Sequence, residues 1–221
     1  KDGQVPKIER IAELIDENER EKAGKLIQRT LERSPGNVRL QLLKARLEVA
    51  QADRAAECGR LLSEHHHLRD SDPYYRALLT AATEVVDSIL TQGVMRTQRF
   101  GEIEQLLNHA GNLAQHDGQL TLSIAIAVHK LGVSMREKLD RDAAKLPPEW
   151  LPLVKPGRNP GADILLPTSP DQPDDFLWRD EIPEPFAKWT GGYLQLAIER
   201  AGDQAAVRRQ ATELAFQRMV T

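Results

Sequence analysis

Apolar side chains recur at the spacing of a helix face in two stretches near the start of the chain. The first comprises Ile8, Ile11, Ala12 and Ile15, and the second comprises Ala23, Leu26, Ile27 and Leu31. Their intervals of three and four residues are those of one side of an α-helix. A polar run at residues 16–19 separates the stretches, and turn-forming residues follow at 34–37. The pattern predicts two antiparallel helices joined tightly as an αα-hairpin.

A second pair of apolar stretches follows, with a break near residues 51–53. It comprises Leu40, Leu43, Leu47 and Ala50, then Ala55, Ala56, Leu61 and Leu62. Asp72 and Pro73 end this pair, because proline cannot continue the helix before it. A second helical hairpin is therefore expected.

Two alanines of the first hairpin have counterparts in the second. Ala12 and Ala23 return 33 residues later as Ala45 and Ala56. Recurrence at a fixed period is typical of helical repeats. We therefore expect Ala23 and Ala56 to lie where helices cross closely.

The run Ala23, Ile27 and Pro35 resembles the second helix of a tetratricopeptide repeat, in which a small residue, a larger apolar residue and a closing proline follow one another. Asn37, just after the proline, also fits. The resemblance covers residues 5–73. It implies stacked hairpins that present a groove for a peptide or helix of another protein, and hence a non-catalytic adaptor or scaffold. Helical hairpins outside that family are the alternative.

The remaining segments also favour helices. Residues 74–95 read as one long helix, and a shorter amphipathic helix follows around residues 103–114. Residues 122–128 alternate as a strand would, but their alanines and the apolar continuation to residue 139 favour a buried helix. Two helices are expected at 184–201 and 203–219. The predicted fold class is all-α.

Proline divides the chain. Ten of its thirteen prolines lie between residues 147 and 185. Because proline lacks an amide donor and clashes with a preceding helical turn, such a stretch cannot be helical. We predict a helical-hairpin body at 1–145, a proline-rich extended connector at 146–184 and a two-helix C-terminal tail at 185–221.

The connector carries a short apolar motif in an acidic setting. Phe176, Leu177 and Trp178 follow two aspartates, and they are the candidate partner-binding residues of this sequence. Such a motif either docks on its own helical body or contacts a partner. Because burying Phe176 and Trp178 yields a large favourable free energy, docking on the body is the preferred interpretation.

Charge and composition narrow the classes of partner. The net charge of −3 supplies no field that would attract a phosphate backbone, so a helical nucleic-acid-binding regulator is a disfavoured alternative. No apolar run reaches the length of a membrane span. Asn-x-Ser/Thr sequons are absent, which gives no support for secretion. We expect a soluble, cytoplasmic chain with protein partners, and self-association into a homo-oligomer stays open.

Local signatures of catalysis and metal binding are missing from the sequence. Neither GxSxG nor HExxH occurs. Cys58 is the only cysteine, and we expect it to be a small buried side chain. Consecutive histidines at 65–67 point in different directions on a helix and cannot converge on one ion. His109 and His116 are expected at the surface or as caps. We predict no catalytic residue, cofactor or metal. The alternative is an enzyme whose site combines distant residues, with the aromatic connector as its lid.

Overall fold

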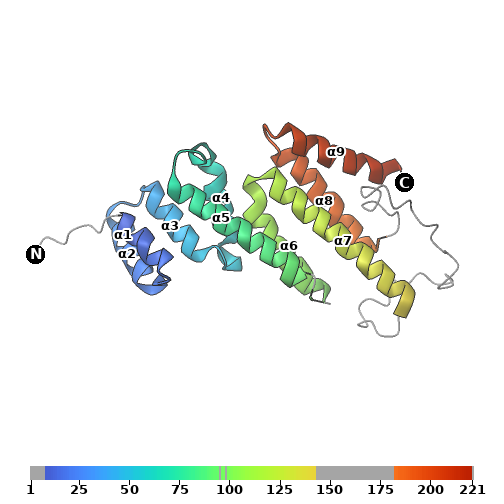
Figure 1. Ribbon diagram of the computed structural model, residues 1–221, viewed down its shortest axis with the longest axis horizontal. Coiled ribbons are helices and arrows are strands. Elements are labelled where there is room, and N and C mark those ends of the chain that lie inside the picture. Colours follow the sequence, from blue (N-terminus) through green and yellow to red (C-terminus); the bar gives the residue numbers. More distant parts are fainter. Residues whose placement is uncertain (1–7, 95, 98, 143–181, 221) are drawn as a thin grey trace, which may run out of the picture. The chain divides into compact units, whose positions relative to one another are not determined.

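The computed structural model describes residues 8–142 and 182–220, apart from residues 95 and 98, with side chains up to residues 137 and 216. Helices dominate these residues, and no strand occurs among them (Figure 1). The all-α prediction is confirmed. The alternating stretch at 122–128 lies inside a helix, as its alanines indicated. In the described part of the chain, no helix is long and apolar enough to cross a bilayer.

The chain forms two compact units. Unit 1 comprises Lys1–Ser88 and Asn112–His116, and unit 2 comprises Ile89–Gly111 and Asp117–Thr221. The predicted boundary at 145/146 lies outside the described residues. The two helices of the expected tail share unit 2 with the last helix of the expected body.

Unit 1 begins with consecutive helices that pack on one another. α1 packs on α2, α2 on α3, and α3 on both α4 and α5. Asn18, with φ at 61°, lies in the short turn after α1, where an asparagine tolerates the left-handed conformation. The bounds of these helices are α1 (Ile8–Asp16), α2 (Arg20–Arg33), α3 (Val38–Glu48), α4 (Ala55–Glu64) and α5 (Pro73–Ser88), with short η1 (Ala52–Arg54), η2 (His66–Leu68) and η4 (Ala114–His116).

The core of unit 1 is built from the predicted apolar faces. Its central cluster comprises Ile11, Ile27, Leu40 and Leu43. Ala23 is fully buried, as expected for a close crossing. Ala56 is exposed, and that part of the prediction is wrong. α4 begins at Ala55, and its buried face includes Ala55 and Cys58 in place of Ala56.

Gly59 allows a close approach within unit 1. A Cβ atom built on Gly59 would lie 2.0 Å from the carbonyl oxygen of Asn112 and 2.6 Å from the side-chain nitrogen of Gln115. Gln115 donates a hydrogen bond of 2.9 Å to the carbonyl oxygen of Ala56. The absence of a side chain at residue 59 thus permits backbone contact between segments that lie more than fifty residues apart.

Unit 2 begins with a π-helical segment, and four α-helices follow among its described residues. The predicted helix at 74–95 is therefore helical through its described residues, with a π-helix at its end. In unit 2, η3 packs against α7, α7 against α8, and α9 against both α7 and α8. The bounds are η3 (Ile89–Val94), α6 (Phe100–Leu113), α7 (Gly118–Asp142), α8 (Glu184–Arg200) and α9 (Ala205–Val220).

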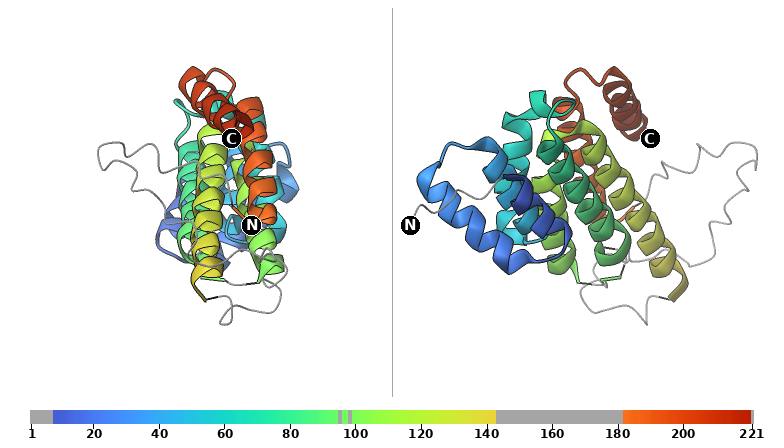
Figure 2. Two further views of the ribbon diagram at one scale, coloured as in Figure 1. Left: turned by 90° about the vertical axis from the view of Figure 1, so that its right-hand side faces the viewer. Right: turned by 60° about the vertical axis from the view of Figure 1, so that its left-hand side comes forward.

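α7 and α8 form a closely packed antiparallel pair, which Figure 1 and the left view of Figure 2 show side by side. Gly118 faces Ala201, and Gly132 faces Phe186, so the helices run in opposite directions. Gly191 and Gly192 lie inside α8 without interrupting it. The shared core comprises Leu122, Ala125, Leu194, Ala197, Ala201, Val207, Ala211 and Leu214.

Candidate partner-binding surface

The start of α5 is set by an aspartate and a proline. Pro73 is the first residue of the helix, where its missing amide costs nothing. Asp72 caps the helix, because its Oδ1 accepts hydrogen bonds from the backbone amides of Tyr74 (2.9 Å) and Tyr75 (3.3 Å). Only 4% of Asp72 is exposed. The sequence interpretation saw in this pair only the end of the preceding hairpin and missed the cap.

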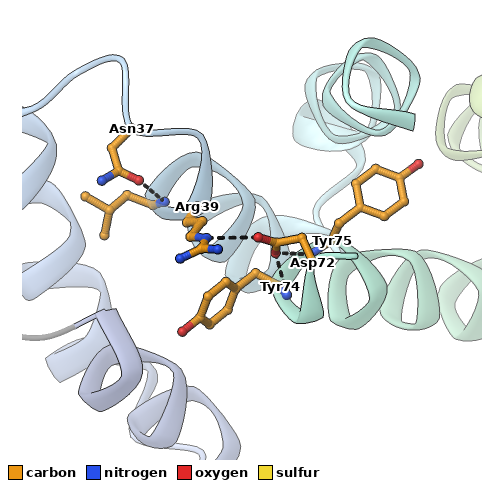
Figure 3. Close-up of polar contacts among 6 residues, drawn as sticks. Asn37, Arg39, Asp72, Tyr74 and Tyr75 are labelled. Atoms are coloured by element: carbon orange, nitrogen blue, oxygen red, sulfur yellow. Dashed lines mark hydrogen bonds and ion pairs between the residues drawn. The ribbon is translucent and has the colours of Figure 1, made fainter. Parts of the chain in front are cut away.

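Arg39 in the first turn of α3 joins this cap from another helix. Its Nε donates a hydrogen bond of 2.9 Å to Oδ2 of Asp72, and its guanidinium carbon lies 5.8 Å from the centre of the Tyr74 ring (Figure 3). Asn37 caps α3 itself by accepting from the amide of Leu40 at 3.2 Å. The ion pair and the ring together hold the guanidinium plane.

Tyr74 and Tyr75 leave the start of α5 in opposite directions (Figure 3). Tyr75 is buried, and its hydroxyl donates to the carbonyl oxygen of Leu62 on α4 at 2.8 Å. Tyr74 is half-buried and packs against the core cluster of α1, α2 and α3. Burial raises the pKa of Tyr74, and the nearby carboxylate of Glu9 raises it further, while Arg39 lowers it. Tyr74 therefore keeps its proton at neutral pH.

A second arginine lies on the same face of α3. Arg46 follows Arg39 by seven residues, about two helical turns. Its Nη2 is 2.8 Å from Oδ1 of Asp16 on α1. Arg39 and Arg46 thus form a basic stripe on α3 whose ends are bound to α5 and to α1.

The outer edge of Arg39 is accessible. More than half of its side chain, 56%, is exposed, and only Nε is engaged in a hydrogen bond with the described residues. A guanidinium held in plane with its Nη1/Nη2 edge free suits a carboxylate or phosphate, because two oxygens can be bound at once. This arrangement is chemically suited to recognition of an acidic group.

A cavity of about 270 Å³ lies among α2, α3 and α4. Leu31, Ala45 and Leu61 give it apolar walls, and Lys44 and Glu57 give it charged ones. Its mixed charges select no particular ligand.

Cys58 also lines this cavity, but its thiol is buried and unreactive. It is 1% exposed, which confirms the predicted small buried side chain, and its Sγ lies 3.5 Å from the carbonyl oxygen of Ala45. Burial first, and then the carboxylates of Glu48 and Glu57, raise the pKa of Cys58 to about 11. The thiolate, which is the nucleophilic form, is therefore scarce at neutral pH.

The histidines of the described residues form no metal site. His66 and His67 are exposed in η2, which follows the end of α4. His109 and His116, expected at the surface or as caps, are instead half-buried and belong to different units. His129 on α7 is almost fully buried, which the sequence interpretation did not anticipate. The described residues contain no group of three or more His, Cys, Asp or Glu side chains that could hold a metal ion.

Buried polar groups in unit 2 serve to join its helices. Asp117 caps α7 by accepting from the amides of Gln119 (2.7 Å) and Leu120 (3.2 Å). Arg200 of α8 donates to the carbonyl oxygen of Gly111 and to Oγ1 of Thr121, both at 3.3 Å. Burial lowers the pKa of Arg200. These contacts tie α8 to α6 and α7.

The predicted partner-binding residues Phe176, Leu177 and Trp178 lie outside the described residues, as does most of the predicted connector. No family model, curated protein or solved structure matches the chain. The tetratricopeptide resemblance of residues 5–73 therefore stays a prediction.

Proposed function

We propose that the chain is a non-catalytic adaptor that binds a peptide or helix of another protein on the helical hairpins of unit 1. The observation that carries this proposal is Arg39, which is held in place by a buried aspartate and a tyrosine ring while its outer edge faces solvent. In this proposal α1 to α4 form two stacked hairpins of the tetratricopeptide type, and the basic stripe of α3 contacts the partner.

Preorganisation supports a recognition role. An arginine on a flexible surface loses side-chain entropy when it binds, whereas Arg39 is already restrained by Asp72 and Tyr74. Restraint of this kind lowers the cost of binding an acidic side chain of a partner. Phe176, Leu177 and Trp178 are proposed as a second contact with a protein partner, separate from the stripe.

Selection from a peptide display library tests the role of unit 1. The bait is the full chain, and selected peptides are compared with the Arg39→Ala variant and with Arg29→Ala as a matched control. Arg29 is an exposed arginine on α2. Loss of a central arginine contact typically weakens binding by at least ~30-fold. We expect acidic peptides that bind the unaltered chain and Arg29→Ala, and that bind Arg39→Ala at least about 30-fold more weakly.

The comparison has a clear opposite outcome. Peptides that bind all three proteins with one affinity would place the contact away from Arg39. Absence of any enriched peptide, with a correctly folded bait, would contradict the adaptor proposal itself.

A further inference from the structure

The cavity among α2, α3 and α4 reaches from the surface of unit 1 to buried apolar side chains. Ala45 and Leu61 in its wall are buried, whereas Pro35 and Glu57 are exposed. Its volume of about 270 Å³ is slightly smaller than the roughly 300 to 1,000 Å³ of pockets that hold drug-sized ligands. The space therefore suits a smaller molecule, with the size of a single amino acid.

A hydrogen bond ties the edge of the cavity together. Nε2 of Gln41 on α3 donates to the carbonyl oxygen of Pro35 at 2.8 Å. Both residues line the cavity, so this bond restrains the turn between α2 and α3 beside it. A site that is formed before its ligand arrives loses less entropy when the ligand binds.

The described residues that line the cavity include four charged ones, two of each sign. Glu57 and Arg60 take part in ion pairs with other side chains. Lys44 and Glu48 form no ion pair and no side-chain hydrogen bond with the residues that the structure describes. The wall thus has one cation and one anion that a ligand could still bind.

The placement of Lys44 and Glu48 on α3 gives the cavity a direction. They lie one helical turn apart, about 6 Å along the axis. A lysine that precedes a glutamate by four residues is the less favourable order for an ion pair within a helix. α3 ends at Glu48, so the partial negative charge of the helix C-terminus adds to that of the carboxylate. A positive group is therefore favoured at the Glu48 end of the cavity, and a negative group at the Lys44 end.

We propose that this cavity binds a free apolar α-amino acid in its zwitterionic form. Lys44 donates to the carboxylate of the ligand, and Glu48 accepts from its ammonium group. Leu31, Ala45 and Leu61 contact its apolar side chain.

The mixture of charges by itself selects no ligand, but the two unpaired groups do. An ion of either sign would satisfy only one of them, whereas a zwitterion satisfies both. The two charged groups of an α-amino acid are attached to one carbon atom. They suit side chains one helical turn apart better than the distant termini of a peptide do.

This inference goes beyond the proposed adaptor role and does not depend on it. Arg39 is not among the described residues that line the cavity. Arg39→Ala should therefore leave amino-acid binding unchanged, and the two proposals can fail separately.

Isothermal titration calorimetry of the full chain with three probes tests the proposal. L-leucine carries both charges, N-acetyl-leucine carries only the carboxylate, and leucine amide carries only the ammonium group. We expect L-leucine to bind with a Kd of about 1 mM or tighter. Each of the other probes should bind at least about tenfold more weakly, because it lacks one charge-assisted hydrogen bond. Failure of L-leucine to bind the folded chain, or equal binding of the three probes, would overturn the proposal.

Two substitutions then locate the site. Lys44→Met should remove the preference for L-leucine over leucine amide, and Glu48→Gln should remove the preference for L-leucine over N-acetyl-leucine. Lys25→Met and Glu32→Gln are the matched controls, because both residues are exposed on α2 and neither lines the cavity. The controls should leave all three affinities unchanged.

Preferences that persist in both Lys44→Met and Glu48→Gln would place the binding elsewhere and overturn the assignment. Both side chains are only half-buried, so the two variants should fold, which circular dichroism verifies. If either variant fails to fold, the three probes on the unaltered chain still decide whether the ligand must carry both charges.

Discussion

Gly132 of α7 faces Phe186 of α8 so closely that a Cβ atom at residue 132 would lie 2.8 Å from the Cβ of Phe186. Real Cβ atoms are not found at such separations, so one of the two helices would have to move. The pairing of α7 and α8 therefore depends on a position that carries no side chain.

Gly132→Ala should destabilise the chain for this reason. Overpacking a close helix contact costs about 1 to 3 kcal/mol, which exceeds the gain of about 0.4 to 1 kcal/mol from replacing a helical glycine. Gly24→Ala in α2 is the matched control, because no atom lies within 4 Å of its Cβ position. Urea unfolding should show a lower free energy of unfolding for Gly132→Ala and a higher one for Gly24→Ala. Equal effects would disprove the close contact.

Gly59→Ala should be more severe. The nearest atom to its Cβ position is a backbone oxygen, that of Asn112 at 2.0 Å, which cannot rotate away as a side chain can. We expect a loss of free energy of unfolding of about 3 kcal/mol or more, at the upper end of overpacking effects. Gly101→Ala, in open surroundings, serves as the control in the same thermal denaturation experiment. A melting temperature that rises in both variants would exclude the approach of Asn112.

Asp72→Ala should remove both a helix cap and an ion pair. Loss of an N-cap costs about 0.5 to 2 kcal/mol, and loss of the partner of Arg39 adds to it. Asp72→Asn keeps an oxygen acceptor for the cap and should cost less. Asp70, two residues earlier, is exposed, so Asp70→Ala should change stability by less than about 0.5 kcal/mol. Chemical denaturation of the three variants measures their losses of free energy of unfolding, which should be largest for Asp72→Ala and smallest for Asp70→Ala.

Tyr193 should make the chain sensitive to alkaline pH. Its hydroxyl donates to the carbonyl oxygen of Leu107 at 2.7 Å, and burial raises its pKa from 10.0 to about 12. Between these values the unfolded chain releases the proton and the folded chain retains it, so this stabilisation is full below pH 10 and is lost as pH rises through about 12.

Tyr193→Phe tests that dependence. It should cost about 1 kcal/mol at neutral pH through the lost hydrogen bond, and it should flatten the decline in stability above pH 10. Cys58, with its pKa at about 11, contributes a separate decline that begins near pH 9. We therefore expect the free energy of unfolding, measured from pH 8 to 12, to fall from about pH 9 in Tyr193→Phe as in the unaltered chain. In Cys58→Ala this first part of the fall should be absent. An unaltered profile in Tyr193→Phe would contradict the assignment.

Ala23→Leu and Ala56→Leu should behave differently. Ala23 is fully buried, so a larger side chain there should cost about 1 to 3 kcal/mol. Ala56 is exposed, and its replacement should change stability by less than about 0.5 kcal/mol. The melting temperatures of the two variants test this difference, and only that of Ala23→Leu should fall. A loss in both would restore the expectation based on the alanine period alone.

The helices and their inner faces follow from the sequence by itself. Periodicity is a local property, because residues three and four apart share one side of a helix wherever that helix lies. Ile11, Ile27, Leu40 and Leu43 were expected inside and form the core cluster of unit 1. The helical state of residues 118–142 could likewise be predicted, since alanines and a long apolar continuation outweigh a short alternation.

Contacts between distant segments were decided only by the tertiary structure. The prediction that Ala56 is buried was wrong. Consecutive residues of a helix point about 100° apart, so a shift of the inner face by one residue turns a neighbouring side chain outward. In α4, which begins at Ala55, the inner face includes Ala55 and not Ala56. Arg39 and Asp72, Gly59 and Asn112, and Leu107 and Tyr193 are each separated by more than thirty residues. The periodicity of a helix shows which of its faces is buried, but not which other helix packs against that face. The candidate surface at Arg39 could therefore not be found until α3 and α5 were placed side by side.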